Sequence, residues 1–153
     1  GERQLGRLAE ELKLRIIRSG TVYGVNPATR FDTFVNRFLL DAALGRSLNV
    51  HGSGEQTRPV VPVDVVATQV VDAALDVSVP PLSHAVVESV TVNNVIEALR
   101  KVYTSLDVIY INQQQQLGGL RMGLFDGLTV DHDISLPVLS DRLKTDLAKI
   151  ALS

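Results

Sequence analysis

The residues with the clearest chemical potential lie together in one short segment of the chain. Gln56, Thr57 and Arg58 offer an amide, a hydroxyl and a guanidinium at three consecutive positions. A guanidinium presents a planar fork of donors that can bind two phosphate oxygens at once. We therefore predict that Arg58 contacts an anionic ligand. A surface ion pair of Arg58 with Glu55 or Asp64 is the alternative interpretation.

The elements on either side must position this segment. Leu48 and Val50 alternate with polar residues, which is the pattern of a half-buried strand. Gly52 and Gly54 supply the positive φ angles that a sharp reversal needs. Residues 59–63 are valines interrupted by two prolines, and prolines are unfavourable in a central strand. The pattern predicts a strand, a tight turn, and then an edge strand or a short strand.

Three segments in this part of the chain resemble one family, the NAD-dependent sugar-nucleotide epimerases and dehydratases, which are extended short-chain dehydrogenases. Residues 18–24 (RSGTVYG) resemble the family's R-x-x-N-x-Y-G segment. Residues 30–45 resemble the helix that closes over the nucleotide, and residues 48–75 resemble its G-x-G-x-Q-x-R and V-x-D-V stretch. The resemblance covers residues 14–75 in the right order and weakens afterwards.

The resemblance implies a nucleotide-sugar site. Arg58 matches the arginine that contacts the diphosphate, and Thr21 lies where the family usually has an asparagine that binds sugar or phosphate. A packed turn is the alternative for Tyr23, and a core or surface position is the alternative for Asn36. The implied substrate-binding residues are Thr21, Tyr23, Asn36, Leu48, Val50, Gln56 and Arg58, with Leu48 and Val50 bordering the base.

Two family features are not found in this chain. In the register that Ala9 and Glu10 set, the catalytic Tyr-x-x-x-Lys pair falls on Glu2 and Gly6, and neither residue can replace a phenol or a lysine cation. Either this register is wrong or the chain lacks the catalytic pair. The family's N-terminal Rossmann unit has no counterpart here, and no G-x-G-x-x-G occurs. We therefore predict no catalytic residues and no cofactor-binding residues in this chain. NAD is implied only for the intact family enzyme, of which this chain would be a fragment or one half.

Composition bounds the possible functions. The chain has 153 residues, of which 45% are hydrophobic and 21% charged, as in a globular domain with its own core. A net charge of −2 gives no electrostatic case for nucleic acid or an anionic membrane. With no cysteine, the cytoplasm is the default compartment. Asp131, His132 and Asp133 are adjacent, and three adjacent side chains rarely converge on one ion, so we predict no metal site.

Hydrophobic periodicity predicts a mixed α/β fold, the C-terminal part of an extended short-chain dehydrogenase, with four to six short strands. About five helices are expected, at residues 4–12, 31–44, 65–75, 94–103 and 141–152.

The boundaries and faces of these elements are also predicted. Asp64 is the expected N-cap of the third helix, and Asn94 with Glu97 the expected start of the fourth. Residues 85–91 and 106–112 are each expected to form a strand. In the third helix, we expect a buried face composed of Val66, Val70, Val71 and Ala74.

The chain is interpreted as one domain, residues 1–153. Residues 1–24 would be a remnant of the Rossmann-side helix and strand, and residues 25–153 the substrate-binding part. The resemblance implies the sugar-nucleotide-binding part of an NAD-dependent epimerase or dehydratase, for a UDP-, dTDP- or GDP-linked sugar. The alternative is a non-catalytic binding or assembly module derived from the same fold. Exposed apolar edges would require a Rossmann-half partner or a homodimer.

Overall fold

The computed structural model describes Leu5, residues 14–76, residues 78–111, residues 144–146 and Ala148. Within these residues the elements are, in chain order, β1 (Ile16–Ser19), β2 (Thr21–Tyr23), α2 (Phe34–Ala43), β3 (Leu48–His51), β4 (Thr57–Pro62), α3 (Val63–Leu75), β5 (Leu82–Ala85), β6 (Glu88–Thr91), α4 (Val92–Arg100) and β7 (Val108–Ile111). The predicted mixed α/β class is confirmed.

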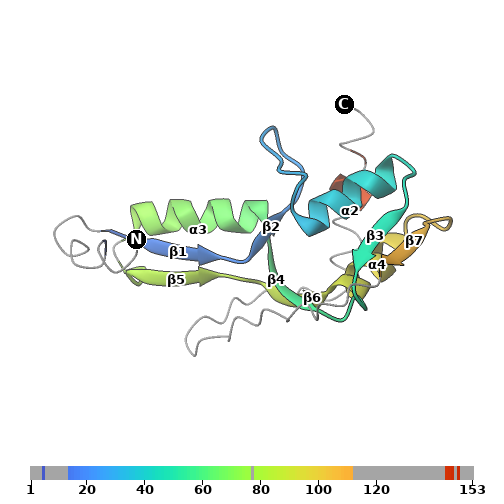
Figure 1. Ribbon diagram of the computed structural model, residues 1–153. Helices are drawn as coiled ribbons and strands as arrows, with labels where there is room; N and C mark the ends of the chain where they lie inside the picture. The colour runs from blue at the N-terminus through green and yellow to red at the C-terminus, as the bar shows by residue number, and fades with distance from the viewer. Residues whose placement is uncertain (1–4, 6–13, 77, 112–143, 147, 149–153) are drawn as a thin grey trace.

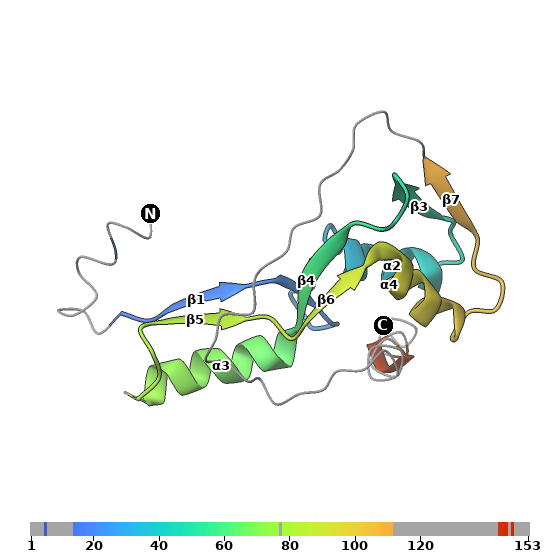
Figure 2. The same cartoon turned by 90° about the horizontal axis from the view of Figure 1, so that it is seen from below.

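The strands form three small sheets (Figure 1). β1 pairs in parallel with β5, and β3 pairs in parallel with β7. The third sheet has the order β2-β4-β6, in which β4 is parallel to β2 and antiparallel to β6. In Figures 1 and 2, α3 lies along β1 and β5 at one end of the molecule. At the other end, α2 and α4 lie beside β3 and β7.

The main core lies between α2, α4 and the strands that they cover. Leu39 of α2 and both Ile96 and Leu99 of α4 are fully buried, and they cluster with Leu48 and Val50 of β3. In α2 the buried apolar residues recur at the spacing of one helical face, so a single side of that helix faces the core. Each such aliphatic side chain contributes roughly 1.5–3 kcal/mol by leaving water.

The predicted buried face of α3 is wrong. Val70 and Val71 are 51% and 53% exposed, and Ala74 is also exposed, whereas Ala73 is the buried residue of this helix. Val66 is half-buried. Apart from Asp64 and Asp72, most of the exposed positions of α3 are small or apolar residues. A periodic pattern identifies residues that share a face, but which face is covered depends on elements distant in sequence.

Helix starts also differ from the predictions. α3 begins at Val63 with Pro62 as N-cap, so Asp64 lies in the first turn, where its charge favours the helix dipole. α4 begins two residues earlier than expected. Thr91 is its N-cap and forms a capping box with Asn94, with both hydrogen bonds at 3.0 Å.

Strand boundaries were predicted less well. The stretch 85–91 is not one strand: Ala85 is the last residue of β5, and β6 covers residues 88–91 in a different sheet. The described residues form seven strands. β4 is a central strand and not an edge strand. Its prolines are tolerated because Pro59 precedes the ladder with β2, which begins at Val60, and Pro62 ends that ladder.

The predicted first and last helices lie mostly outside the described residues. Leu5 is helical, and so are residues 144–146 and Ala148. The Asp131-His132-Asp133 run and the positions Glu2 and Gly6 are also outside the part of the chain that the structure describes.

Candidate functional site

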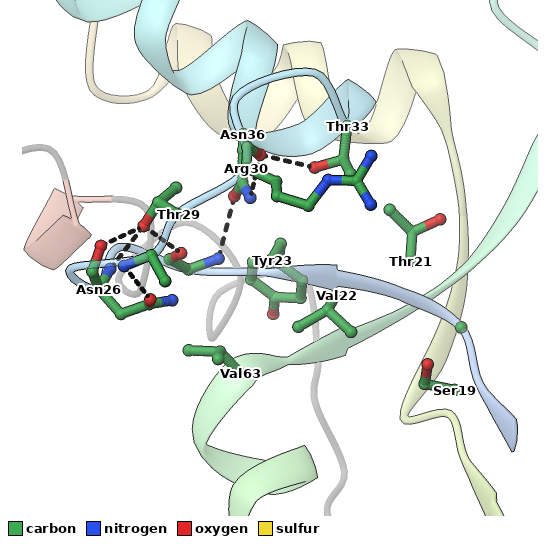
Figure 3. Close-up of a pocket in the computed structure, with 13 residues that line it drawn as sticks. Ser19, Thr21, Val22, Tyr23, Asn26, Thr29, Arg30, Thr33, Asn36 and Val63 are labelled. Carbon is green, nitrogen blue, oxygen red and sulfur yellow. Dashed lines mark hydrogen bonds between the residues drawn. The ribbon is translucent and has the colours of Figure 1, made fainter. Parts of the chain in front are cut away.

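A pocket of about 460 Å³ opens between β2 and the N-terminal end of α2. Figure 3 shows it under the loop that joins these two elements. Tyr23 and Pro62 end the parallel strands β2 and β4, and the residues that follow them, Gly24 and Val63, line the pocket. The pocket therefore lies at the carboxyl ends of a parallel strand pair, where open α/β sheets usually bind ligands.

The described residues that line the pocket come from one continuous stretch, which runs from the end of β1 through β2 and the loop into α2, and from the first residue of α3. They are Ser19, Gly20, Thr21, Val22, Tyr23, Gly24, Asn26, Ala28, Thr29, Arg30, Thr33, Asn36 and Val63.

Side-chain hydrogen bonds hold the loop over the pocket. The Asn36 side-chain oxygen accepts from the backbone N–H of Gly24 at 3.0 Å, and its nitrogen donates to the Arg30 carbonyl at 3.0 Å. Asn26 turns the chain, because its side-chain oxygen accepts from the N–H of Ala28 at 2.8 Å. Thr29 Oγ1 accepts from the N–H of Asn26 at 2.6 Å. These hydrogen bonds therefore define the path of the loop.

Arg30 is the charged residue among the described residues that line the pocket. Its side chain is 75% exposed and forms a two-pronged contact with Asp32, whose Oδ1 accepts from Nε at 3.0 Å. Hydrogen bonding to Asp32 raises the pKa of Arg30, and the same hydrogen bond lowers the pKa of Asp32. Arg30 thus places a permanent positive charge at the pocket, shared with one carboxylate.

Of the seven sequence-predicted site residues, Thr21, Tyr23 and Asn36 line the pocket. Thr21 is half-buried, while the Tyr23 side chain is almost fully buried in the core. Both hydrogen-bonding groups of the Asn36 amide are already used by the loop backbone. Thr21 is therefore the half-buried residue of the three, and it lies outside the core cluster.

Arg58 lies beyond the described pocket lining but on the same face of the sheet as Thr21 and Tyr23. Thr21 pairs with Val60 in parallel register, and Arg58 precedes Val60 by two residues. Side chains two residues apart on a strand share a face. Arg58 is half-buried, and its Nη1 donates to the neighbouring Thr57 carbonyl at 3.1 Å. The register therefore places Arg58 on the face of the sheet that carries Thr21, two residues before the strand partner of Thr21.

The remaining predicted residues lie apart from the pocket. Gln56 is in the turn between β3 and β4, and its Nε2 donates to the His51 carbonyl at 3.0 Å. Leu48 and Val50 are fully buried in the core, so contact of either residue with a base would have to involve the backbone of β3.

Arg30 and Thr33 are pocket residues that the sequence reading missed. It assigned residues 31–44 to a helix, whereas α2 begins at Phe34 and the preceding residues form the pocket loop. The Asn26-Pro27 turn signal directly after a strand was the available clue, because loops at strand carboxyl ends commonly carry binding residues.

Within the described part of the chain, no group of three or more His, Cys, Asp or Glu side chains is arranged to hold a metal ion. No helix of that part has the length and apolar character required to cross a membrane.

Comparison with solved structures identifies the fold. No protein-family model and no curated protein matches the chain. The structure resembles a UDP-N-acetylglucosamine 4-epimerase from Methanobrevibacter ruminantium M1, with 19% identity and a TM-score of 0.71 over 97% of this chain and 51% of that one. It also resembles a UDP-glucuronic acid 4-epimerase from Bacillus cereus, with 19% identity and a TM-score of 0.70 over 99% of this chain and 50% of that one.

An NAD-dependent NDP-hexosamine 5,6-dehydratase of tunicamycin biosynthesis is similar at 21% identity and a TM-score of 0.69, over 91% of this chain and 46% of that one. The chain thus has the fold of part of the NAD-dependent sugar-nucleotide epimerases and dehydratases. It spans about half the length of these solved structures.

Proposed function

We propose that this chain is the sugar-nucleotide-binding part of an NAD-dependent epimerase or dehydratase. The observation that carries the proposal is the shared sheet face of Thr21 and Arg58 beside a pocket at the carboxyl ends of β2 and β4. The M. ruminantium and B. cereus structures of the same fold hold UDP-N-acetylmuramic acid and UDP-glucuronic acid. This likeness supports a nucleotide-sugar as the ligand class, and the side chains of the site support the individual contacts.

The proposed ligand is a UDP-, dTDP- or GDP-linked sugar. Its diphosphate is the most strongly charged portion, and guanidinium groups bind phosphate oxygens through charge-assisted hydrogen bonds. Arg58 would contact the diphosphate. Thr21 would donate a hydroxyl hydrogen bond to sugar or phosphate, and Arg30 would add a positive charge at the pocket.

A complete enzyme would need a second part that binds NAD. The exposed apolar residues of α3, Val70, Val71 and Leu75, support a partner surface at the end of the molecule formed by α3, β1 and β5. We propose that a dinucleotide-binding half covers it, with residues 1–24 on the Rossmann side of the boundary and residues 25–153 as the substrate-binding part. A homodimer is the other proposed occupant.

The alternative function is a non-catalytic binding or assembly module derived from the same fold. The absence of a Tyr-x-x-x-Lys pair at Glu2 and Gly6, where the register of the resemblance places it, supports this alternative. The two functions are distinguished by adding NAD and UDP-glucose to this chain together with a dinucleotide-binding half. An epimerised or dehydrated product supports the enzyme, and binding without turnover supports the module.

Calorimetric titration of UDP-glucose into this chain tests the proposed site. Arg58→Ala should weaken binding by about 1.5–3 kcal/mol, the usual contribution of a hydrogen bond to a charged group. Arg58→Lys should recover only part, because one ammonium cannot form the two-pronged contact. Arg46→Ala, at an arginine whose side chain is 64% exposed, is the matched control and should bind like the parent. Equal affinity of the parent and Arg58→Ala would refute the assignment, and loss of folding would favour a structural role.

A further inference from the structure

A cluster of hydrogen bonds joins the β3–β4 turn to the start of α4 and to β7, with Asn93 at its centre. The Asn93 side-chain nitrogen donates to the Ser53 carbonyl at 3.2 Å and to Glu55 Oε1 at 2.6 Å. Its side-chain oxygen accepts from the Tyr110 hydroxyl at 3.0 Å. The backbone N–H of Asn93 donates to the Gly54 carbonyl at 3.1 Å. One residue of α4 therefore contacts three consecutive residues of the turn.

Gly54 makes this close approach possible. Its φ of +79° lies in the left-handed region, and a β-carbon there would lie 2.7 Å from Cγ of Asn93. Any larger residue at position 54 would displace the Asn93 amide. The turn and the amide are thus fitted to each other.

The clamped turn leads directly into the segment assigned to the diphosphate. Thr57, the first residue of β4, pairs with Thr91, which is the N-cap of α4 and lies two residues before Asn93. Gln56 is held from the other side by its hydrogen bond to the His51 carbonyl. Contacts with α4, β6 and β3 therefore fix the turn that ends at Gln56. Arg58 follows this turn as the second residue of β4.

We infer that Asn93 is a positioning residue for the nucleotide diphosphate, through the β3–β4 turn, which ends at Gln56 and leads into β4 and Arg58. The inference rests on the proposed function. Asn93 acts through the turn and does not itself contact the ligand. Its hydrogen bonds order the β3–β4 turn before binding, so that ligand binding does not have to order it. Tyr110 supports Asn93 from β7 through one hydrogen bond.

The test measures UDP binding by calorimetry for the parent, Asn93→Ala, Arg58→Ala and the double variant. Asn93→Ala should weaken UDP binding roughly two- to tenfold, the cost of ordering a freed turn. In the Arg58→Ala background the same change should have little further effect, because the strand that follows the turn then presents no guanidinium. Asn49→Ala, an exposed amide on β3, is the control and should bind UDP like the parent. Hydrogen exchange of the backbone amides at residues 53–56 should accelerate in Asn93→Ala.

A second pair of variants keeps the test independent of simple loss of packing. Asn93→Asp removes the two donated hydrogen bonds and places a second carboxylate beside Glu55, so binding should weaken further. Adding Glu55→Gln to Asn93→Asp restores a donor and an acceptor with reversed polarity, and should recover part of the affinity. A merely structural role would not predict recovery of UDP affinity by this reversal.

The outcomes separate the two proposals. Parent-like UDP affinity in Asn93→Ala, with Arg58→Ala weakened, overturns the inference and leaves the proposed site intact. Additive losses in the double variant also overturn it. If the parent does not bind UDP, the proposed function fails and the inference fails with it. If Asn93→Ala does not fold, the reversed pair decides: recovery of affinity supports the inference, and its absence overturns it.

Discussion

The side-chain oxygen of Asn36 accepts a hydrogen bond from the backbone N–H of Gly24, 12 residues earlier, over 3.0 Å. The same amide donates to the Arg30 carbonyl, so one side chain of α2 holds both ends of the pocket loop. Asn36 is only 3% exposed. Its amide thus fixes the path of the loop that carries Arg30, and contact with a ligand would require that these bonds open.

Asn36→Ala should lower the free energy of unfolding by about 1–3 kcal/mol, because it leaves the buried Gly24 N–H without its acceptor. Asn36→Asp should not be milder, since it buries a carboxylate and turns an acceptor toward the Arg30 carbonyl. Urea denaturation monitored by circular dichroism measures both. Asn49→Ala on the exposed side of β3 is the control and should stay within about 0.5 kcal/mol of the parent. An unchanged midpoint for Asn36→Ala would contradict this role.

Asp32 should titrate below the usual pKa of an aspartate, about 3.9, because its hydrogen bond with Arg30 favours the carboxylate. A folded-state pKa below the unfolded value means that the contribution of this pair is present above about pH 4 and is lost as pH falls through the folded pKa. Carboxyl resonances followed by NMR between acidic and neutral pH measure it. Arg30→Gln should return the Asp32 pKa toward its ordinary value. A pKa that is the same with and without Arg30 would show that the pair does not persist in solution.

The exposed residues of α3 should tolerate polar substitution. Val71→Lys and Leu75→Lys should change the free energy of unfolding by no more than about 0.5 kcal/mol, because these side chains are 53% and 81% exposed. Both changes should reduce binding of a hydrophobic dye and self-association measured by light scattering. Leu99→Ala in the core is the contrast and should cost about 2–5 kcal/mol. A large stability loss in Val71→Lys would mean that this face is covered within the chain.

The chain alone should not bind NAD measurably. Dinucleotide binding of this type uses a glycine-rich turn at a helix N-terminus, and the sequence has no G-x-G-x-x-G. Calorimetric titration with NAD should therefore give only heats of dilution. An intact epimerase of the same fold is the positive control. Micromolar affinity in this chain would refute the expectation and would require a different cofactor site.

Local features were the most predictable from sequence. Gly52 and Gly54 have positive φ angles of 85° and 79°, as expected for glycines in a tight turn. The apolar stripe of α2 faces the core, because a single helical face determines it. The central place of β4 was not predictable from its prolines, since its ladders form with strands far away in sequence.

The site was predictable where it depends on local motifs, and not where it depends on contacts distant in sequence. Thr21, Tyr23 and Asn36 line the pocket, and motif order was sufficient to select them. Arg30 was missed because its place at the pocket depends on the path of the loop. Two hydrogen bonds of Asn36 determine that path. Leu48 and Val50 alternate correctly as a strand, but their alternation alone does not distinguish a ligand-facing side from a core-facing side.

The parallel pairing of β3 with β7 has a consequence for folding kinetics. The hydrogen bond between Ser47 and Asp107 at the base of this ladder joins residues 60 positions apart, and the pairing of β1 with β5 is similarly remote. Such contacts form only after a long loop has closed, which slows folding relative to helical proteins of the same size. During synthesis, β3 emerges well before β7, so one edge of β3 stays unpaired in the nascent chain. Chaperone dependence of this protein should therefore be greatest before residue 111 leaves the ribosome.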